Sequence, residues 1–261
     1  MDIRANRKEL RVNMDYMEQR LFDLYDKYLY SYDELREKAL AETCYTEYSK
    51  GGETFHRGYY CPSLVQDLII GNANRGRLLK RRPAVNYDYI YYLNEARQII
   101  MVDDFDSRKT LTTREFVIYQ ESNEVSVEYR MSCHSNQINM ERASLCDYEA
   151  GKLRAYRHLC ASAYCRDDGS RYVSKYSYSI SAEDYDYDES GLLCESVLGE
   201  KLSYKIETSS GELKTEGGTY ENAYRFFQNE DGFLYAYKPL EPRPDGLDPM
   251  YYVSKSKLRK I

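Results

Sequence analysis

The sequence predicts an α+β protein, in which N-terminal helices lead into a large antiparallel β-sheet of tandem hairpins. Three observations predict this class. Apolar residues recur at helical spacing near the N-terminus, tyrosine-rich segments alternate large and small side chains between residues 86 and 240, and turn signals interrupt those segments regularly. Hydrophobic residues make up 42% of the chain, but 30 are tyrosines and none is tryptophan, so we expect a core with polar edges.

Residues 5–40 are predicted to be helical. Apolar side chains recur there every three or four residues, which places them on one stripe of a helix. The stripe consists of Leu10, Met14, Met17, Leu21, Leu24 and Tyr28. Ser31 and Glu34 have the spacing of a capping box, so a second helix is expected to begin at that point. We expect the stripe to pack on the chain's own sheet, and docking to another protein is the alternative.

A connector between the helices and the sheet is predicted before residue 83. Ser63 is placed to cap a short helix that follows it. Residues 71–78 then have the glycine spacing of a phosphate-binding P-loop, but Arg77 and Leu78 stand where that motif needs lysine and a hydroxyl residue. We therefore expect the cations of this segment to form a solvated connector.

The turn glycines that predict the sheet recur about every twenty residues. They are Gly151, Gly169, Gly191, Gly211 and Gly232. Glycine adopts the positive φ that hairpin turns need at no steric cost. Each repeated unit is predicted to be a strand, a short turn and a second strand, so that hairpins lie side by side in one antiparallel sheet.

The segments between the turns have the alternation of half-buried strands. Large side chains fall on every second residue of 175–180, and in 184–188 the tyrosines take one face and the aspartates the other. Tyrosine is a strong strand former because it packs on a pleated surface while its hydroxyl stays hydrated. We expect the same sheet to begin at Tyr87.

The segment from Tyr185 to Leu193 resembles the core of the YD repeat of Rhs-type proteins. A Tyr-Asp pair there precedes Gly191 and a hydrophobic residue, and three other turn glycines keep the Gly-x-Leu ending. The resemblance covers residues 148–237 and implies a sheet of tandem hairpins. Similar sheets occur in bacterial immunity proteins that neutralise toxins, so the resemblance implies that function by analogy of fold.

Composition divides the chain into three parts. Residues 1–82 are predicted to be a helical region, and residues 83–240 an antiparallel hairpin-repeat domain. Residues 241–261 form a proline-rich segment and a basic tail, because closely spaced prolines exclude regular structure up to residue 248. Residues 250–253 are expected to add one last strand.

One acidic segment has the partial spacing of a calcium loop. Asp184, Asp186, Asp188 and Glu195 stand at positions one, three, five and twelve of an EF-hand loop. Glu189 occupies the position that needs glycine, and strands are predicted to flank the segment. We therefore expect a charged outer face that blunts the sheet, and no metal.

A second group of residues has the chemistry of zinc ligands without their spacing. His158, Cys160 and Cys165, with Cys146, fall within a short span, but the tight Cys-x-x-Cys pairs of zinc sites are missing. Cysteines in strands are more often small buried hydrophobic residues. The sequence predicts no cofactor.

The sequence does not predict an enzyme. It contains three histidines, and Cys133 next to His134 would point to the opposite face of a strand. The seven cysteines have no framework spacing, so we expect free thiols in a cytoplasmic protein. No stretch approaches the ~20 apolar residues that cross a bilayer, so we expect no membrane segment.

The predicted function is binding of another protein in the cytoplasm, specifically as an immunity protein that neutralises a cognate bacterial toxin. The net charge of −6 suits a basic partner and disfavours nucleic acid. The predicted partner-binding residues are Tyr185, Asp186, Tyr187 and Asp188, with Tyr87, Tyr89, Tyr91 and Tyr92 as a second group. The alternatives are an enzyme or binding module for saccharide or nucleotide, and a structural component of a secretion or surface apparatus.

Overall fold

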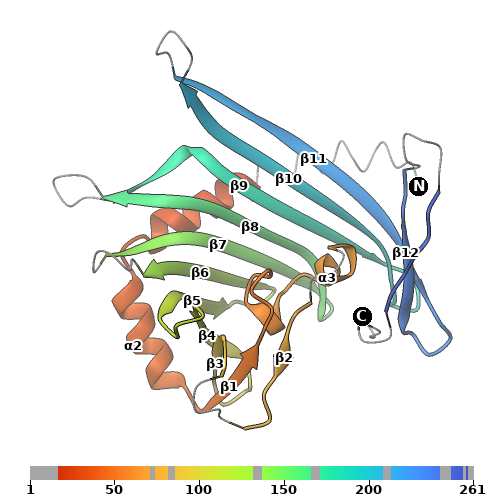
Figure 1. Cartoon of the computed structure of the whole chain (residues 1–261), viewed down its shortest axis with the longest axis horizontal. Helices are drawn as coiled ribbons and strands as arrows, with labels where there is room; N and C mark the ends of the chain where they lie inside the picture. The colour runs from red at the N-terminus through yellow and green to blue at the C-terminus, as the bar shows by residue number, and fades with distance from the viewer. Residues whose placement is uncertain are drawn as a thin grey trace.

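The protein is described by a computed structural model. It describes residues 17–70, 74–81, 86–131, 137–165, 171–207, 213–241, 248–254 and 257. Within them, helices near the N-terminus precede an antiparallel sheet of thirteen strands (Figure 1). The predicted α+β class is therefore confirmed. None of the helices in these residues is long and apolar enough to cross a membrane.

Most of the sheet is a meander in which each strand pairs with the next along the chain. The strands are β3 (Tyr89–Leu93), β4 (Ile99–Phe105), β5 (Leu111–Tyr119), β6 (Asn123–Met131), β7 (Ile138–Glu149), β8 (Lys152–Cys165), β9 (Arg171–Tyr187), β10 (Leu193–Glu207), β11 (Leu213–Gln228) and β12 (Leu234–Pro239). At one edge β13 (Tyr251–Tyr252) follows β12, which confirms the strand expected at residues 250–253. At the other edge β1 (Tyr45–Lys50) lies between β3 and β2 (Arg77–Leu78). Both edge strands are only two residues long, which leaves little edge for pairing with another chain.

Turn glycines were predicted correctly at three positions, but the unit between them was not. Gly151, Gly191 and Gly232 have φ of 76°, 82° and 79° in the turns that follow β7, β9 and β11. Gly169 and Gly211 lie outside the described residues. Each interval between successive turn glycines holds one long strand, whereas a pair of strands was predicted. Strands β8 to β11 are 14, 17, 15 and 16 residues long. Strands of globular proteins usually have about 3–10 residues, which is why an interval of this length was divided in two.

The two N-terminal helices cover one face of the sheet, called the helix face. Residues 17–28 are helical, and α2 comprises Tyr32–Glu42. Leu21 and Tyr25 share a buried cluster with Val127 and Leu159 from the strands. The predicted stripe is confirmed at its described buried members, whereas its first two residues lie outside the described part. The second helix begins directly after Ser31 as predicted, although the Ser31 side chain makes no capping hydrogen bond.

The predicted helical region of residues 1–82 also contains strands. β1 pairs with β3 from Tyr45 opposite Leu93 to Ser49 opposite Tyr89. The prediction was wrong here because the short β1 segment was not separated from the loop that follows it. Residues from both predicted regions therefore form one continuous sheet.

The opposite face, called the loop face, packs against residues 51–70. This loop contains the 3-10 helix η1 (Gly58–Tyr60) and α3 (Gln66–Ile69), which Figure 1 shows in front of the sheet. The Ser63 hydroxyl accepts the N–H groups of Val65 and Gln66 at 3.2 and 3.0 Å, but the helix begins two residues later than predicted, with Val65 at the N-cap position. Arg75, from the predicted solvated connector, instead donates to the carbonyls of Cys61 and Ser63 and ties the loop down.

The Tyr25 hydroxyl joins the first helix to irregularities in two strand pairs. It donates to the carbonyl of Glu141 and accepts the N–H of Ala161 at 3.0 Å. Glu141 of β7 has no opposed residue in β6 where the register of the two strands shifts. The pairing of β8 with β9 also shifts, between Ala161 and Ala163. One buried side chain thus bonds backbone groups at two β-bulges, which the sheet ladder does not pair regularly.

Replacing Tyr25 by phenylalanine tests this role. We expect Tyr25→Phe to lower the free energy of unfolding by about 1–3 kcal/mol, because two buried backbone groups lose a partner. Urea denaturation measures the change. Tyr30→Phe is the matched control, since the exposed Tyr30 hydroxyl also bonds a backbone N–H, that of Arg171, and its loss should cost less than about 0.5 kcal/mol. Equal losses in the two variants would contradict the assignment.

Candidate functional site

Tyr185 lies inside the protein, so it does not form the exposed surface that the sequence predicted. Its ring belongs to a buried cluster beneath α3. The hydroxyl donates to the carboxylate of Glu183 and accepts the N–H of Leu64 at 3.0 Å. The prediction was wrong because alternation shows which residues share a face and does not show which loop covers it.

Tyr91 and Tyr89, from the second predicted group, are also buried under residues 51–70. The Tyr91 hydroxyl donates to the carbonyl of Arg57 at 2.9 Å and accepts the N–H of Tyr59 at 3.1 Å. Gly58 packs so closely on the Tyr89 ring that an added Cβ would lie 2.5 Å from it. These tyrosines bind the chain's own loop, and their prediction as exposed partner-binding residues is corrected in the same way.

The remaining predicted residues are scattered. Asp186 and Asp188 are exposed, and Asp188 accepts the N–H of Leu192 within its turn at 2.9 Å. Tyr187 is half-buried and its hydroxyl donates to the carbonyl of Leu153 at 2.8 Å. Tyr92 is a half-buried residue of β3, and Tyr87, two residues before that strand, is also half-buried. The eight residues therefore do not form one surface.

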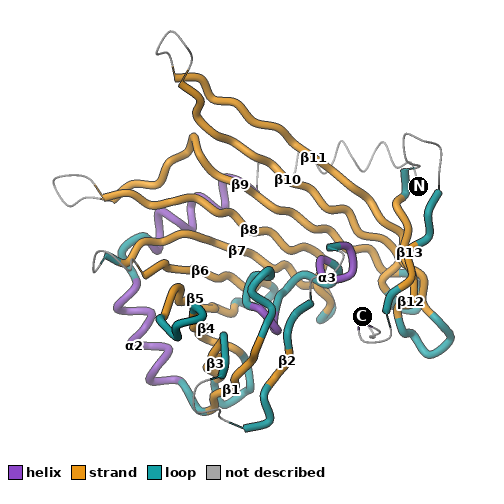
Figure 2. Tube along the Cα trace, viewed as in Figure 1, coloured by secondary structure: helices purple, strands orange, loops and turns teal. Residues whose placement is uncertain are grey.

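An exposed apolar surface lies on the loop face where β10 and β11 pass beyond α3. We call it the open face, and it consists of Glu200, Leu202, Tyr204, Glu216 and Tyr220. These residues share a side, since Glu200 pairs with Tyr220 and Tyr204 pairs with Glu216 across the two strands. Leu202, Tyr204 and Tyr220 are 38%, 44% and 60% exposed. Figure 2 shows β10 and β11 running side by side away from α3.

The open face is continuous with a hollow at its base. The hollow has a volume of about 210 Å³ and lies between α3 and strands β9 to β11. Its lining includes Ile70, Glu183 and Leu198, together with Glu200 and Tyr220 of the open face. Burial raises the pKa of Glu183, whose carboxylate is held by the hydroxyl of Ser63 and the amide of Gln66.

A second candidate site lies under the loop, where carboxylates are buried opposite one another. Glu115 of β5 pairs directly with Glu128 of β6, and Glu128 pairs with Arg142 of β7. Like charges at opposed positions of a sheet destabilise it unless they are compensated. Arg142 Nη1 donates to Glu128 at 3.0 Å and compensates one of the two carboxylates.

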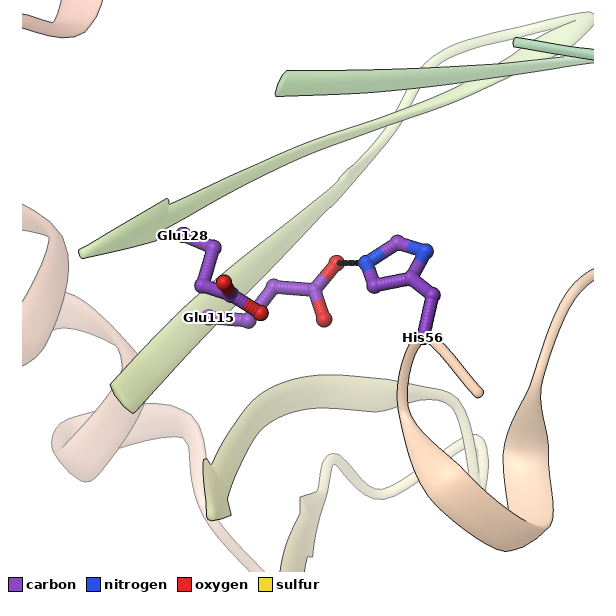
Figure 3. Close-up of side chains that lie close together, drawn as sticks. All are labelled: His56, Glu115 and Glu128. Carbon is purple, nitrogen blue, oxygen red and sulfur yellow. Dashed lines mark hydrogen bonds and ion pairs between the residues drawn. The ribbon is translucent and has the colours of Figure 1, made fainter. Parts of the chain in front are cut away.

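The loop supplies the groups that compensate the other carboxylate. His56 Nε2 lies 2.9 Å from Glu115 Oε1, and Arg57 Nε donates to the same oxygen at 2.8 Å. Arg57 Nη1 also donates to Glu124. Figure 3 shows Glu115 and Glu128 approaching one another and His56 reaching Glu115 from the loop. The His56 Nδ1 atom lies 2.6 Å from the hydroxyl of Tyr156.

These contacts separate the pKa values of the cluster. Burial lowers the pKa of His56 to about 4, so the ring is neutral near pH 7 and donates from Nε2 while Nδ1 accepts from Tyr156. Burial alone would raise the pKa of Glu115, but the Arg57 guanidinium and His56 hold it well below its usual range. Burial, with the charge of Glu115, raises the pKa of Glu128 to about 7 despite Arg142. Paired carboxyls with separated pKa values are characteristic of sites that bind or exchange protons.

The cluster borders a cavity of about 200 Å³. Glu53, Thr54 and Arg130 are exposed at its rim, whereas His56 and Arg57 are buried inside. Arg57 has φ of 60°, a left-handed conformation that is uncommon for residues other than glycine.

The cluster fits a metal ion poorly. His56, Glu115 and Glu128 each offer a ligand atom within 4.8 Å of the others, and they form the single such group found within the described residues. Arg57 already donates to the Glu115 oxygen that would coordinate the ion, and both His56 nitrogens are engaged. A cation would therefore displace or adjoin a guanidinium.

The residues that the sequence offered as possible zinc ligands make other contacts. His158 Nδ1 lies 3.0 Å from the hydroxyl of Tyr156, and Cys160 Sγ accepts from Arg142 Nε at 3.2 Å. Cys146 is buried in the cluster beneath α3. The side chain of Cys165 lies outside the described residues.

Comparison with known proteins identifies no function. Neither a protein-family model nor a curated protein matches the sequence. Among solved structures, the chain is similar to a protein of unknown function from Bacteroides fragilis NCTC 9343, with 11% sequence identity and a TM-score of 0.27. The similarity covers 51% of this chain and 91% of that chain. The resemblance of residues 148–237 to YD repeats stays a prediction.

The pH dependence of stability tests the environment of Glu128. In the folded protein Glu128 keeps its proton up to about pH 7, whereas an ordinary glutamate releases it near 4.5. The folded state binds more protons between these values, so stability falls as the pH rises through this window. Asp104, whose pKa burial raises to about 6, acts in the same direction. The lowered pKa of Glu115 has the opposite effect, and its contribution is lost only below the ordinary pKa.

Glu128→Gln removes one source of this fall. We expect the stability of the variant relative to the natural protein to rise by about 1–3 kcal/mol between roughly pH 5 and pH 8. Urea denaturation at several pH values measures it. Glu189→Gln, in the exposed turn after β9, should show a constant difference over the same range. Parallel stability curves for Glu128→Gln and the natural protein would show that Glu128 is ionised as in water.

Proposed function

We propose that this chain binds another protein through the open face, and that it acts as an immunity protein that neutralises a cognate bacterial toxin. The observation that carries the proposal is the exposure of Leu202, Tyr204 and Tyr220 side by side on two adjacent strands. Contiguous exposed apolar groups with polar neighbours are characteristic of protein interaction sites. Tyrosine suits such a site because it gives a large contact area at low cost in conformational entropy.

The chemistry of the open face favours a basic partner. Glu200 and Glu216 are exposed between the apolar side chains. The whole chain has a net charge of −6, which favours encounter with a basic protein. Gly218 stands opposite Leu202, and the Tyr220 side chain lies over it, since a Cβ added at Gly218 would be 3.4 Å from the Tyr220 hydroxyl.

The open face contains none of the eight residues that the sequence predicted as partner-binding. The buried tyrosines beneath the loop are unsuited to first contact with a partner, whereas the open face needs no rearrangement. The proposed location is the cytoplasm. The five cysteines whose side chains are described are free thiols, which agrees with a reducing compartment.

A double substitution on the open face tests the proposal. The immobilised full chain is used to capture partners from a lysate of its source organism, and captured proteins are identified by mass spectrometry. We expect Tyr204→Ser with Tyr220→Ser to weaken capture of the cognate toxin at least about tenfold, because central aromatic residues dominate interface energies. Tyr252→Ser is the matched control, since Tyr252 is 75% exposed on β13, away from this face.

Growth measurements then decide whether the captured protein is a toxin. Expression of that protein alone should arrest growth, and co-expression of the natural chain should restore it. The double variant should fail to restore growth while the control variant succeeds. A captured protein that leaves growth unaffected would contradict the immunity function. Equal protection by the double variant would contradict the open face as the binding site.

A further inference from the structure

The cavity under residues 51–60 has features of a binding site for a small molecule. Such a site would be independent of the proposed function. Its volume of about 200 Å³ is below the roughly 300–1,000 Å³ of pockets for drug-sized ligands. Its rim is exposed at Glu53, Thr54 and Arg130, and its interior is formed by buried charged groups. It is therefore open to a ligand of few atoms and lined by groups that would orient one.

Arg57, which lines the cavity, has a donor without an acceptor. The residue is 6% exposed and lines the cavity. Its Nε and Nη1 atoms bind Glu115 and Glu124, but its buried Nη2 atom has no hydrogen-bond partner among the described residues. Buried donors are almost always paired, so this nitrogen indicates an acceptor atom that comes from outside the chain.

On the other side of the cavity, it is carboxyl groups that lack partners, because few basic side chains bind them. Within the described residues, Glu128 forms an ion pair only with Arg142, and it lies opposite Glu115. The half-buried Asp104 has no basic side chain within 4.0 Å in the described part of the chain. Burial raises the pKa of both Glu128 and Asp104, which agrees with this shortage. These carboxylates indicate a cationic donor from outside the chain.

We propose that the cavity binds a small zwitterion of the amino-acid class. Its carboxylate accepts from Arg57, and its ammonium group donates to Asp104 and Glu128. One molecule of this class supplies both missing partners at once, and a small amino acid suits the volume of the cavity. The site is held ready by the left-handed backbone of Arg57, which the carbonyl contact with Tyr91 fixes.

The balance of charge around the cavity argues against simple ions. The lining includes the carboxyl groups of Glu53, Asp104, Glu115 and Glu128 and the guanidinium groups of Arg57, Arg130 and Arg142. These charges nearly cancel, so neither an anion nor a cation alone gains a large attraction. A dipolar ligand gains from both signs when its ends match the two sides.

A ligand series on the unaltered full chain tests the proposal. Thermal unfolding is measured with each proteinogenic amino acid and β-alanine, and separately with acetate, methylammonium and zinc chloride. Selective binding to the folded state raises the unfolding temperature as the ligand concentration passes its Kd. We expect at least one small amino acid to raise it, and to do so at concentrations where acetate and methylammonium have little effect. Calorimetric titration then gives its Kd.

Two conservative variants locate the binding groups. Arg57→Lys keeps the positive charge and removes the Nη2 donor, and Asp104→Asn keeps the volume and removes the negative charge. Each should raise the Kd at least about tenfold, because each loses a charge-assisted hydrogen bond. The matched controls are Arg154→Lys and Asp186→Asn, which change exposed residues of the neighbouring strands β8 and β9. The controls should leave the Kd unchanged.

Several results would overturn the proposal. Stabilisation by acetate or methylammonium equal to that by the amino acid would indicate a simple ion site. Stabilisation by zinc alone would indicate a metal site, and no stabilisation by any probe would leave only water in the cavity. If Arg57→Lys does not fold, the ligand series and Asp104→Asn still decide. The open-face double variant should keep full affinity for the amino acid, so failure of the proposed immunity function is distinguishable from failure of this site.

Discussion

Residues 51–70 can cover the loop face only because their charges match charges that the strands bury. Glu115 and Glu128 are opposed on adjacent strands, and removing two such carboxylates from water costs several kcal/mol each unless partners are close. Arg57 from the loop and Arg142 from β7 provide those partners. The loop, the polar cavity and the burial of the tyrosines all depend on this compensation.

Tyrosine hydroxyls complete what the ion pairs begin. Tyr91 holds the loop at Arg57, Tyr185 holds it at Leu64, and Tyr156 orients the His56 ring. Phenylalanine would pack equally well in these places but would leave the loop's backbone groups without partners. The scarcity of phenylalanine relative to tyrosine is therefore explained by a core that binds an irregular loop as well as a helix. The face left uncovered, beyond α3, keeps Tyr204 and Tyr220 exposed.

Much of the fold could be predicted from the sequence, because its signals are local. The helical stripe through Leu21 and the turn glycine at Gly191 each depend on a few neighbouring residues, and both are confirmed. The strand length between turns and the loop over Tyr185 depend on residues far apart in the chain, and neither was foreseen. The candidate site was missed for the same reason. Glu128 alternates with apolar residues along β6, so it has the pattern of a solvent-facing glutamate until His56 and Arg57 are placed above it.

A double-mutant cycle between Arg57 and Glu115 tests the central claim most directly. The free energy of unfolding is measured by urea denaturation for the natural protein, Arg57→Met, Glu115→Gln and the double variant. If the buried pair holds the loop on the sheet, each single change is strongly destabilising and the coupling energy is at least about 2 kcal/mol. Effects that add within about 0.5 kcal/mol would contradict the account, since the loop would then be held without the pair.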